Sequence, residues 1–251
     1  MDTIIKGDHQ LGYFGLVNDQ DFITGRALQH HLNLHRANFS LNNIGWLKFA
    51  FNNRELYVAK KCFIYNLSWE LIYQAGAVYG TDDYGENPSG YKRVQNAQIT
   101  INDQSFRITL LTGHSSKATE YTKKDQLSEW EQLMYRVCKR YKVDDGTPGH
   151  RPIPFEDFDS FSLSELGIGK FNGGSSWCQE AAGATWCRGN QRTPDHRVFR
   201  GMFGIDFAHL YHAKGYRSYI GWRPALRGNR PIVGDSFNET TPNEERGIRT
   251  F

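Results

Sequence analysis

The sequence predicts a loop-rich α+β protein organised as one large or two small domains. Its 251 residues provide enough chain for a substantial hydrophobic core. Aromatic residues make up 14% of the chain and glycine occurs 25 times, which favours short strands and many turns over a helical bundle. Segments with an apolar residue at every second position predict β-hairpins, and segments with helical spacing predict helices.

The first 43 residues differ in pattern from the rest of the chain. Phe22 and Leu28 lie at the spacing of a short helix over residues 21–32, and Gly25 weakens that helix. A polar stretch over residues 36–43 follows. We therefore expect residues 1–43 to form an N-terminal docking segment, separate from a domain that starts at residue 44.

Two β-hairpins are predicted from alternation and turn chemistry. Residues 46–51 alternate in type, and Asn52 and Asn53 tolerate the positive φ that a tight hairpin turn needs before residues 54–61 continue the pattern. The second hairpin covers residues 98–111, with its turn at Asn102 and Asp103.

Two helices are predicted inside the domain. Ser68 is a suitable N-cap for the first, which ends near Gly76. The second covers residues 128–141, with Ser128 as its N-cap, acidic residues in its first turn and basic residues in its last. Its apolar stripe consists of Trp130, Leu133, Met134, Val137 and Tyr141.

Regular patterns are weaker after residue 143. Residues 144–175 predict a long loop, which in a compact domain is usually functional or held by its neighbours. Short apolar pieces bounded by turn residues then predict strands at residues 175–180, 184–189, 196–201 and 218–226. From Arg227 the chain is polar, so we expect residues 227–251 to form an extended C-terminal arm.

The order of these motifs resembles a group of tailed-phage virion proteins. The motifs are GYFGLVNDQDFITGRAL, GWLKF, LYVAKK, SWELIYQAGAVYGTDD, EWEQLMYRV, WCQE, HRVFRG and GWRPAL, and together they extend over about residues 11–226. The last three resemble the C-type-lectin-like fold that formylglycine-generating enzymes share. The resemblance therefore implies a C-type-lectin-like, or sulfatase-modifying-factor-like, α+β domain over residues 44–226 with short strands, two main helices and long loops.

In that fold a strand with an RVxRG motif precedes a variable loop, and a strand with a GWRP motif closes the domain. The residues for which we expect a structural role are Trp177, Arg200, Gly201, Gly221, Trp222, Arg223 and Pro224. Trp222 offers a large apolar ring for the core, and Arg223 offers donors to loop carbonyls or to a carboxylate. Gly201 and Gly221 allow close backbone approach or unusual φ.

The loop over residues 202–219 is the candidate contact region. Aromatic rings mixed with a few polar groups are typical of glycan or protein contact surfaces. The candidate ligand-binding residues are Phe203, Asp206, His209, Tyr211, His212, Tyr216, Arg217 and Tyr219. The alternative is that about half of these aromatic rings pack beneath the loop, and that the histidines are solvated loop residues.

Cys178 and Cys187 are the residues that bear on catalysis. The formylglycine-generating relatives use a cysteine pair near the C-terminus, but here both cysteines precede the RVFRG strand. We interpret them as small buried apolar residues. No CxxC pair, HExxH pattern, phosphate-binding loop or GxSxG elbow occurs, so the sequence predicts no metal and no cofactor.

By resemblance, the chain is expected to be a non-enzymatic structural protein of a phage virion, in a tail, fibre, neck or decoration component used for host attachment or receptor binding. Expected partners are other virion proteins, copies of itself and a host-surface glycan or protein. Assembly would occur in the host cytoplasm. A net charge of +3 does not favour nucleic acid, and no apolar run approaches the roughly 20 residues that membrane insertion requires.

Two alternatives remain open from the sequence. The first is an oxidase of the formylglycine-generating kind, which requires Cys178 and Cys187 to be exposed and close together. The second is a ligand-binding protein diversified by a retroelement, because the same C-terminal motifs occur in the variable proteins of diversity-generating retroelements.

Overall fold

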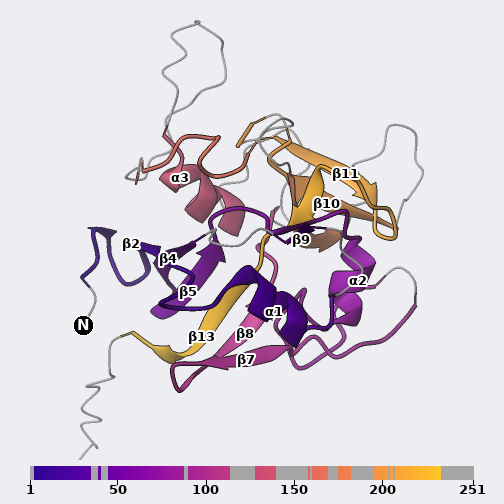
Figure 1. Cartoon of the computed structure of the whole chain (residues 1–251), viewed down its shortest axis with the longest axis horizontal. Helices are drawn as coiled ribbons and strands as arrows, with labels where there is room; N and C mark the ends of the chain where they lie inside the picture. Colours follow the sequence, from indigo (N-terminus) through magenta and orange to yellow (C-terminus); the bar gives the residue numbers. More distant parts are fainter. Residues whose placement is uncertain are drawn as a thin grey trace, which may run out of the picture.

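The structure is a computed structural model that describes residues 3–34, 39–40, 45–87, 90–113, 128–139, 158, 160–168, 175–181, 195–202, 204–205 and 207–232. This part of the chain is a mixed α+β structure in which two sheets, mostly antiparallel, are accompanied by a few short helices (Figure 1). The predicted α+β class is confirmed.

The larger sheet has seven strands in the order β1-β2-β4-β5-β13-β8-β7. In chain order these strands are β1 (Lys6–Gly7), β2 (Leu11–Val17), β4 (Trp46–Phe51), β5 (Arg54–Ala59), β7 (Gln98–Ile101), β8 (Gln104–Thr109) and β13 (Ala225–Pro231). All of its pairings are antiparallel. The C-terminal strand β13 therefore lies in the interior of the sheet, between β5 and β8 (Figure 1).

The two predicted hairpins are confirmed. β4 pairs with β5 around Asn52 and Asn53, whose φ angles are 52° and 59°, and β7 pairs with β8 around Asn102 and Asp103, at 48° and 61°. Two successive positive φ angles give a two-residue turn whose twist matches that of the flanking strands. Asparagine and aspartate tolerate this conformation, and that is why these turns could be recognised.

The N-terminal residues belong to the larger sheet. β2 pairs with β4 from Leu11 opposite Phe51 to Val17 opposite Trp46, with a register shift next to Gly15. This pairing corrects the expectation of a docking segment separate from the domain over residues 1–43. The glycines within residues 11–17 and the irregular register interrupt the alternation by which a strand is recognised.

The C-terminal arm also begins later than expected. β13 continues through Pro231, and Arg227 and Gly228 pair with Arg107 and Phe106 of β8. Residues 227–231 are therefore strand residues rather than part of an extended arm, and residues 233–251 lie outside the described residues. The polar composition was misleading because residues 229–231 are exposed at the end of the strand.

The smaller sheet has six strands in the order β11-β10-β9-β12-β6-β3. In chain order they are β3 (Phe39–Ser40), β6 (Ile64–Tyr65), β9 (Ser175–Ala181), β10 (His196–Arg200), β11 (Ala208–His212) and β12 (Ile220–Trp222). β12 and β9 are parallel, and the other pairings of this sheet are antiparallel. The strands predicted at residues 175–180 and 196–201 are confirmed, and residues 184–189 lie outside the described residues.

Two short helices begin at side-chain caps. α1 (Gly25–His31) is capped by Thr24, whose Oγ1 accepts the Ala27 N–H at 3.2 Å. α2 (Trp69–Gln74) is capped by Ser68, whose Oγ accepts the Leu71 N–H at 3.3 Å, as predicted. Gly25 opens α1 rather than interrupting it, so its low helix propensity costs less than expected.

The helix predicted over residues 128–141 is shorter than expected. It consists of a π-helical turn, η1 (Trp130–Met134), followed by α3 (Tyr135–Val137). The backbone turns to an extended conformation at Cys138, and the carbonyls of Arg136 and Val137 accept the N–H groups of Phe158 and Phe161. Backbone groups that would continue the helix are therefore bonded to a distant segment, which local sequence patterns do not encode.

The core lies on both faces of the β4–β5 hairpin. One cluster brings Trp46 and Tyr57 together with α2 and with Trp177, Phe199 and Trp222 of the smaller sheet. The other brings Phe49 and the opposite face of the hairpin against η1 and α3. The two faces of one hairpin thus connect the two sheets and the helical segment.

Candidate functional site

The candidate contact region is partly regular. Residues 208–212 form β11, which pairs with β10 from Arg200 opposite Ala208 to His196 opposite His212. This corrects the expectation of an irregular loop over residues 202–219. Figure 1 shows the orange strands β10 and β11 at the upper right, with α2 beneath them. The remaining described part, residues 213–219, connects β11 to β12.

The predicted ligand-binding residues separate into three groups. His209, Tyr216 and Arg217 are exposed, and Tyr216 keeps 62% of its surface accessible. Tyr211, His212 and Tyr219 are half-buried, and the two tyrosines pack against the main core cluster. Phe203 and Asp206 lie outside the described residues. The exposed surface therefore combines an aromatic ring, a guanidinium and an imidazole.

Arg217 and Tyr211 are adjacent across the connection between β11 and β12. The Arg217 guanidinium lies over the Tyr211 ring at 5.1 Å from its centroid, and Tyr211 lies 6.3 Å from the Trp177 ring. This stack runs from the exposed cation to a buried indole. It fixes the orientation of the surface cation without neutralising its charge.

Arg223 of the GWRP motif is buried, with 1% of its surface exposed. Its Nε donates to Ser176 Oγ at 2.9 Å, and its Nη2 donates to the Leu166 carbonyl at 2.6 Å. Its Nη1 donates to the carbonyls of Ala59, at 3.1 Å, and of Lys60. One side chain thus joins the end of β5 in the larger sheet, β9 in the smaller sheet and the segment over residues 160–168.

The neighbours of Arg223 in the GWRP motif are equally buried. Trp222 is fully enclosed and lies 5.2 Å from the Phe63 ring, and Pro224 is buried. At Gly221 a Cβ atom would lie 2.6 Å from the Ile64 carbonyl oxygen, so only glycine fits there without displacing β6. The motif therefore fills the junction between the sheets.

The RVFRG strand, β10, also carries a buried arginine that donates to a backbone carbonyl. Arg200 is buried, donates to the Gly113 carbonyl at 2.7 Å, and has its Nη1 3.2 Å from Glu131 Oε1. Gly201 follows with φ of 92°, a conformation that side-chain-bearing residues rarely adopt. Trp177 of the neighbouring strand β9 lies opposite Phe199, is buried, and donates its Nε1 N–H to the Leu67 carbonyl at 2.8 Å.

A further supporting residue was not identified from the sequence. Trp130 of η1 is fully buried, and its Nε1 donates to the carbonyl of Ile205, which lies three residues before β11, at 2.6 Å. The sequence placed Trp130 on an apolar stripe, which accounts for its ring but not for its N–H. Because the acceptor is a backbone carbonyl, which every residue has, no sequence signal could have found the pairing.

Three ionisable groups lie at the open end of the β10–β11 hairpin. His196 and His212 are opposite each other, with ring centroids 5.7 Å apart, and His212 Nε2 is 3.8 Å from Asp195 Oδ2. Burial, and then the nearby charge of His212, lower the pKa of His196, and Asp195 opposes this effect. Both imidazoles being charged at once is therefore unfavourable.

The cysteines are buried where the structure describes them. Cys178 is fully enclosed and packs against Val198, and Cys187 lies outside the described residues. Cys62, which the sequence did not single out, is also enclosed, with its Sγ 3.1 Å from Ser176 Oγ. Burial raises the pKa of the Cys62 thiol despite the nearby Arg223. An enclosed neutral thiol is a poor nucleophile.

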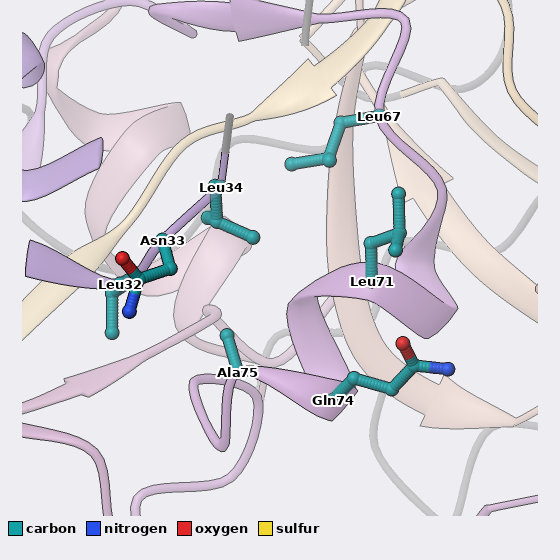
Figure 2. Close-up of a pocket in the computed structure, with 7 residues that line it drawn as sticks. All are labelled: Leu32, Asn33, Leu34, Leu67, Leu71, Gln74 and Ala75. Atoms are coloured by element: carbon teal, nitrogen blue, oxygen red, sulfur yellow. The ribbon is translucent and has the colours of Figure 1, made fainter. Parts of the chain in front are cut away.

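Two other surfaces lie away from β11. A pocket of about 270 Å³ lies between the end of α1 and α2 (Figure 2). Its lining is Leu32, Asn33, Leu34, Leu67, Leu71, Gln74 and Ala75. The irregular segment between α2 and β7 exposes Tyr84 and Tyr91, and its backbone is held by the Tyr73 hydroxyl, which donates to the Tyr84 carbonyl at 2.7 Å.

Within the described residues, His, Cys, Asp and Glu side chains do not gather in any group of three or more arranged to hold a metal ion. His31 and His35 are four residues apart in the sequence, a spacing that two metal ligands on one helix could have. His31 Nε2 lies 2.7 Å from the Gln98 carbonyl oxygen, and His35 lies outside the described residues. Among the helices described, none has both the length and the apolar character needed to cross a bilayer.

The chain matches no protein-family model, and no curated protein matches it. Among solved structures it is similar to Treponema denticola variable protein 1, with a TM-score of 0.33 and 11% sequence identity over 90% of this chain and 97% of that chain. A TM-score of this size does not establish a shared fold. The structure itself shows a mixed α+β architecture with two mostly antiparallel sheets.

Proposed function

We propose that this chain is a non-enzymatic structural protein of a tailed-phage virion, with a C-type-lectin-like domain that serves host attachment. It binds by non-covalent contact through the surface formed by His209, Tyr216 and Arg217. Its partners are other virion proteins, copies of itself and a host-surface glycan or protein. Many copies on one particle make weak single contacts sufficient.

The observation that supports this proposal is the contrast between the exposed surface and its support. Tyr216 and Arg217 are exposed, whereas Arg200, Trp222 and Arg223 of the RVFRG and GWRP motifs are buried and hydrogen-bonded or tightly packed. A rigid scaffold that carries exposed polar and aromatic side chains loses little conformational entropy on binding. The enclosed thiols of Cys62 and Cys178 fit recognition better than thiol chemistry.

Binding of the fluorescently labelled full chain to intact cells of the bacterium that carries the gene tests the proposal. We expect saturable binding that the double variant Tyr216→Ala, Arg217→Ala weakens by about tenfold or more, because central aromatic and arginine residues dominate such contacts. Tyr91→Ala, which removes another exposed tyrosine from the segment between α2 and β7, is the matched control and should bind normally. Equal binding by the double variant, with both proteins folded, contradicts the proposed surface.

A further inference from the structure

β11 is the terminal strand of the smaller sheet. It pairs with β10 on one side, and among the described residues no strand lies on its other side. A terminal strand presents unpaired backbone N–H and C=O groups to any extended chain that approaches it, and proteins usually protect such an edge.

The hydrogen-bonding pattern identifies the outward-facing residues. The Ala213 N–H donates to the Asp195 carbonyl and the Gly201 N–H donates to the Phe207 carbonyl, so residues 207 and 213 bond inward to the β10 side. In an antiparallel pair, hydrogen-bonded and non-hydrogen-bonded residues alternate. Residues 209 and 211 therefore also bond inward, and the N–H and C=O groups of Ala208, Leu210 and His212 face the open edge.

One histidine side chain covers an outward-facing N–H group of β11, and a second covers an N–H group just beyond the strand. His209 Nδ1 accepts the Leu210 N–H at 2.7 Å, and His212 Nδ1 accepts the Lys214 N–H at 3.1 Å. An imidazole accepts through Nδ1 only when its proton is on Nε2, in the neutral form. Protonation converts Nδ1 into a donor and breaks the bond, and histidine is the side chain that ordinarily changes charge between pH 5 and 8.

We propose that β11 is a pairing edge for the β11 strand of a second copy of this chain, closed at neutral pH by the His209 imidazole and opened when that imidazole is protonated. Leu210 is the central residue of the strand, and its N–H is the one that His209 covers. Antiparallel pairing about Leu210 brings the two Leu210 residues opposite each other, where each N–H donates to the other carbonyl.

The side chains of β11 favour a second copy as the occupant. In this register His209 lies opposite Tyr211 of the other copy, and Ala208 lies opposite His212. No two histidines are direct cross-strand partners, so the pair tolerates the protonation that opens it. A single chain of the same sequence thus supplies a self-complementary edge with two-fold symmetry.

The His209 imidazole packs against aromatic rings. Its ring stacks on Phe199 at 5.6 Å and lies 5.9 Å from Phe207, both uncharged. The two arginines of β10 are engaged elsewhere. Arg197 lies over the Trp69 ring and donates to the Glu86 carbonyl, and Arg200 is paired with Glu131.

The charged groups near the end of β11 face His212 instead. Asp195 Oδ2 lies 3.8 Å from its Nε2, His196 lies across the strand pair, and Lys214 donates its backbone N–H to the ring. Glu70 of α2 is linked to the same turn, because its N–H donates to the Ala213 carbonyl. The Arg217 guanidinium lies over Tyr211. We therefore assign the acid-dependent uncovering of the Leu210 N–H, at the centre of the strand, to His209.

Sedimentation velocity of the full chain at pH 7.5 and pH 5.0 tests this inference, with far-ultraviolet circular dichroism to verify folding at both values. We expect self-association at least about tenfold tighter at pH 5.0, because two Leu210 N–H groups gain partners in each pair. His209→Phe keeps an aromatic ring against Phe199 but has no acceptor, so it should associate at pH 7.5 as the unaltered chain does at pH 5.0.

Two further variants separate edge pairing from other causes. Leu210→Pro removes the outward N–H without touching a bond to β10, and it should abolish the acid-induced association while the chain stays folded. His212→Phe removes the cap beyond the end of β11 and should keep the pH dependence. Association that is independent of pH, or that Leu210→Pro leaves unchanged, overturns the inference. Failure of the edge-pairing inference would not count against the proposed function, because the cell-binding test concerns Tyr216 and Arg217.

Discussion

A single buried arginine connects parts of this molecule that lie far apart in the sequence. Arg223 donates to Ala59, Lys60, Leu166 and Ser176 and lies 5.7 Å from the Trp130 ring. All four acceptors are neutral oxygen atoms, so its charge is stabilised by dipoles rather than by a carboxylate in the described part of the chain. Buried charged groups persist only where most of their hydrogen bonds are made, as they are here.

Replacing Arg223 should therefore destabilise the fold by more than the loss of its buried side-chain surface alone would. Arg223→Met keeps most of the side-chain volume but leaves three carbonyls and the Ser176 hydroxyl without this donor. We expect the free energy of unfolding to fall by about 3 kcal/mol or more, because each buried group left unsatisfied costs about 1–3 kcal/mol.

Chemical denaturation of Arg223→Met beside Arg217→Ala provides the measurement. Arg217 is exposed, and its removal should change stability by no more than about 0.5 kcal/mol. Equal stability of Arg223→Met and the unaltered chain would show that Arg223 does not hold the two sheets together.

Gly221 is the second residue at which a small change should have a large effect. A Cβ atom there would lie 2.6 Å from the Ile64 carbonyl and 2.9 Å from Cys62 Cβ. We expect Gly221→Ala to lower stability by about 1–3 kcal/mol, because β6 and β12 must separate to admit the methyl group. Thermal unfolding measures this directly, and an unchanged melting temperature would mean that the two strands are less closely packed than described.

At the scale of single elements, local chemistry determines the start of both short helices. Thr24 and Ser68 each accept an N–H from the first turn of α1 and α2. Replacing either residue by alanine should cost about 1 kcal/mol, because the N–H loses its partner. Ser164→Ala, on an exposed turn, is the matched control with an expected change within about 0.5 kcal/mol. Urea unfolding that ranks the three variants alike would contradict the capping roles.

The β10–β11 hairpin should weaken in acid. The lowered pKa of His196 means that the unfolded chain binds a proton more readily than the folded chain. This contribution to stability is present above the ordinary histidine value of 6.5 and is lost as the pH falls through the lower pKa of the folded state. We expect the melting temperature to fall between pH 7.5 and pH 5.5, and to fall less in His196→Gln. Identical pH dependence in the two proteins would rule out this cause.

The elements that could be predicted are those whose signal is local. Asn52, Asn53 and Ser68 act on backbone groups within a few residues, so the hairpin turn and the helix cap were recognisable from the sequence alone. Strand β11 was not recognised, because its five residues alternate weakly and depend on pairing with β10. The sequence led us to expect that Arg223 donates to loop carbonyls or to a carboxylate, but not to which carbonyls, since any residue provides one.

At the scale of the whole molecule, the C-terminal strand β13 completes the larger sheet. It separates β5 from β8, and Arg227 on it donates to Glu129 at 2.6 and 2.7 Å. Glu129 in turn accepts the Thr112 N–H at 2.9 Å, so the strand also connects the sheet to the start of η1. The last strand that the structure describes is therefore part of the core rather than an addition to it.

Two truncations separate the role of β13 from that of the residues beyond it. A chain that ends at residue 226 loses most of β13 and should fail to fold or should unfold at a much lower temperature, because β5 and β8 lose the strand between them. A chain that ends at residue 232 keeps the whole strand and should unfold normally. Its incorporation into phage particles, measured by mass spectrometry of purified virions, should fall if residues 233–251 contact a neighbouring subunit. Normal folding of the shorter chain would contradict the placement of β13.

We propose that the rigid, Arg223-linked scaffold displays residues 209–217 for contact on a virion. Electron cryo-microscopy of intact phage particles from the bacterium that carries the gene tests it most directly. We predict density for this chain on the particle, with β11 and the following residues against a neighbouring copy or facing the outside. Particles that lack the chain, or that hold it with this surface turned into the interior and away from every partner, would contradict the claim.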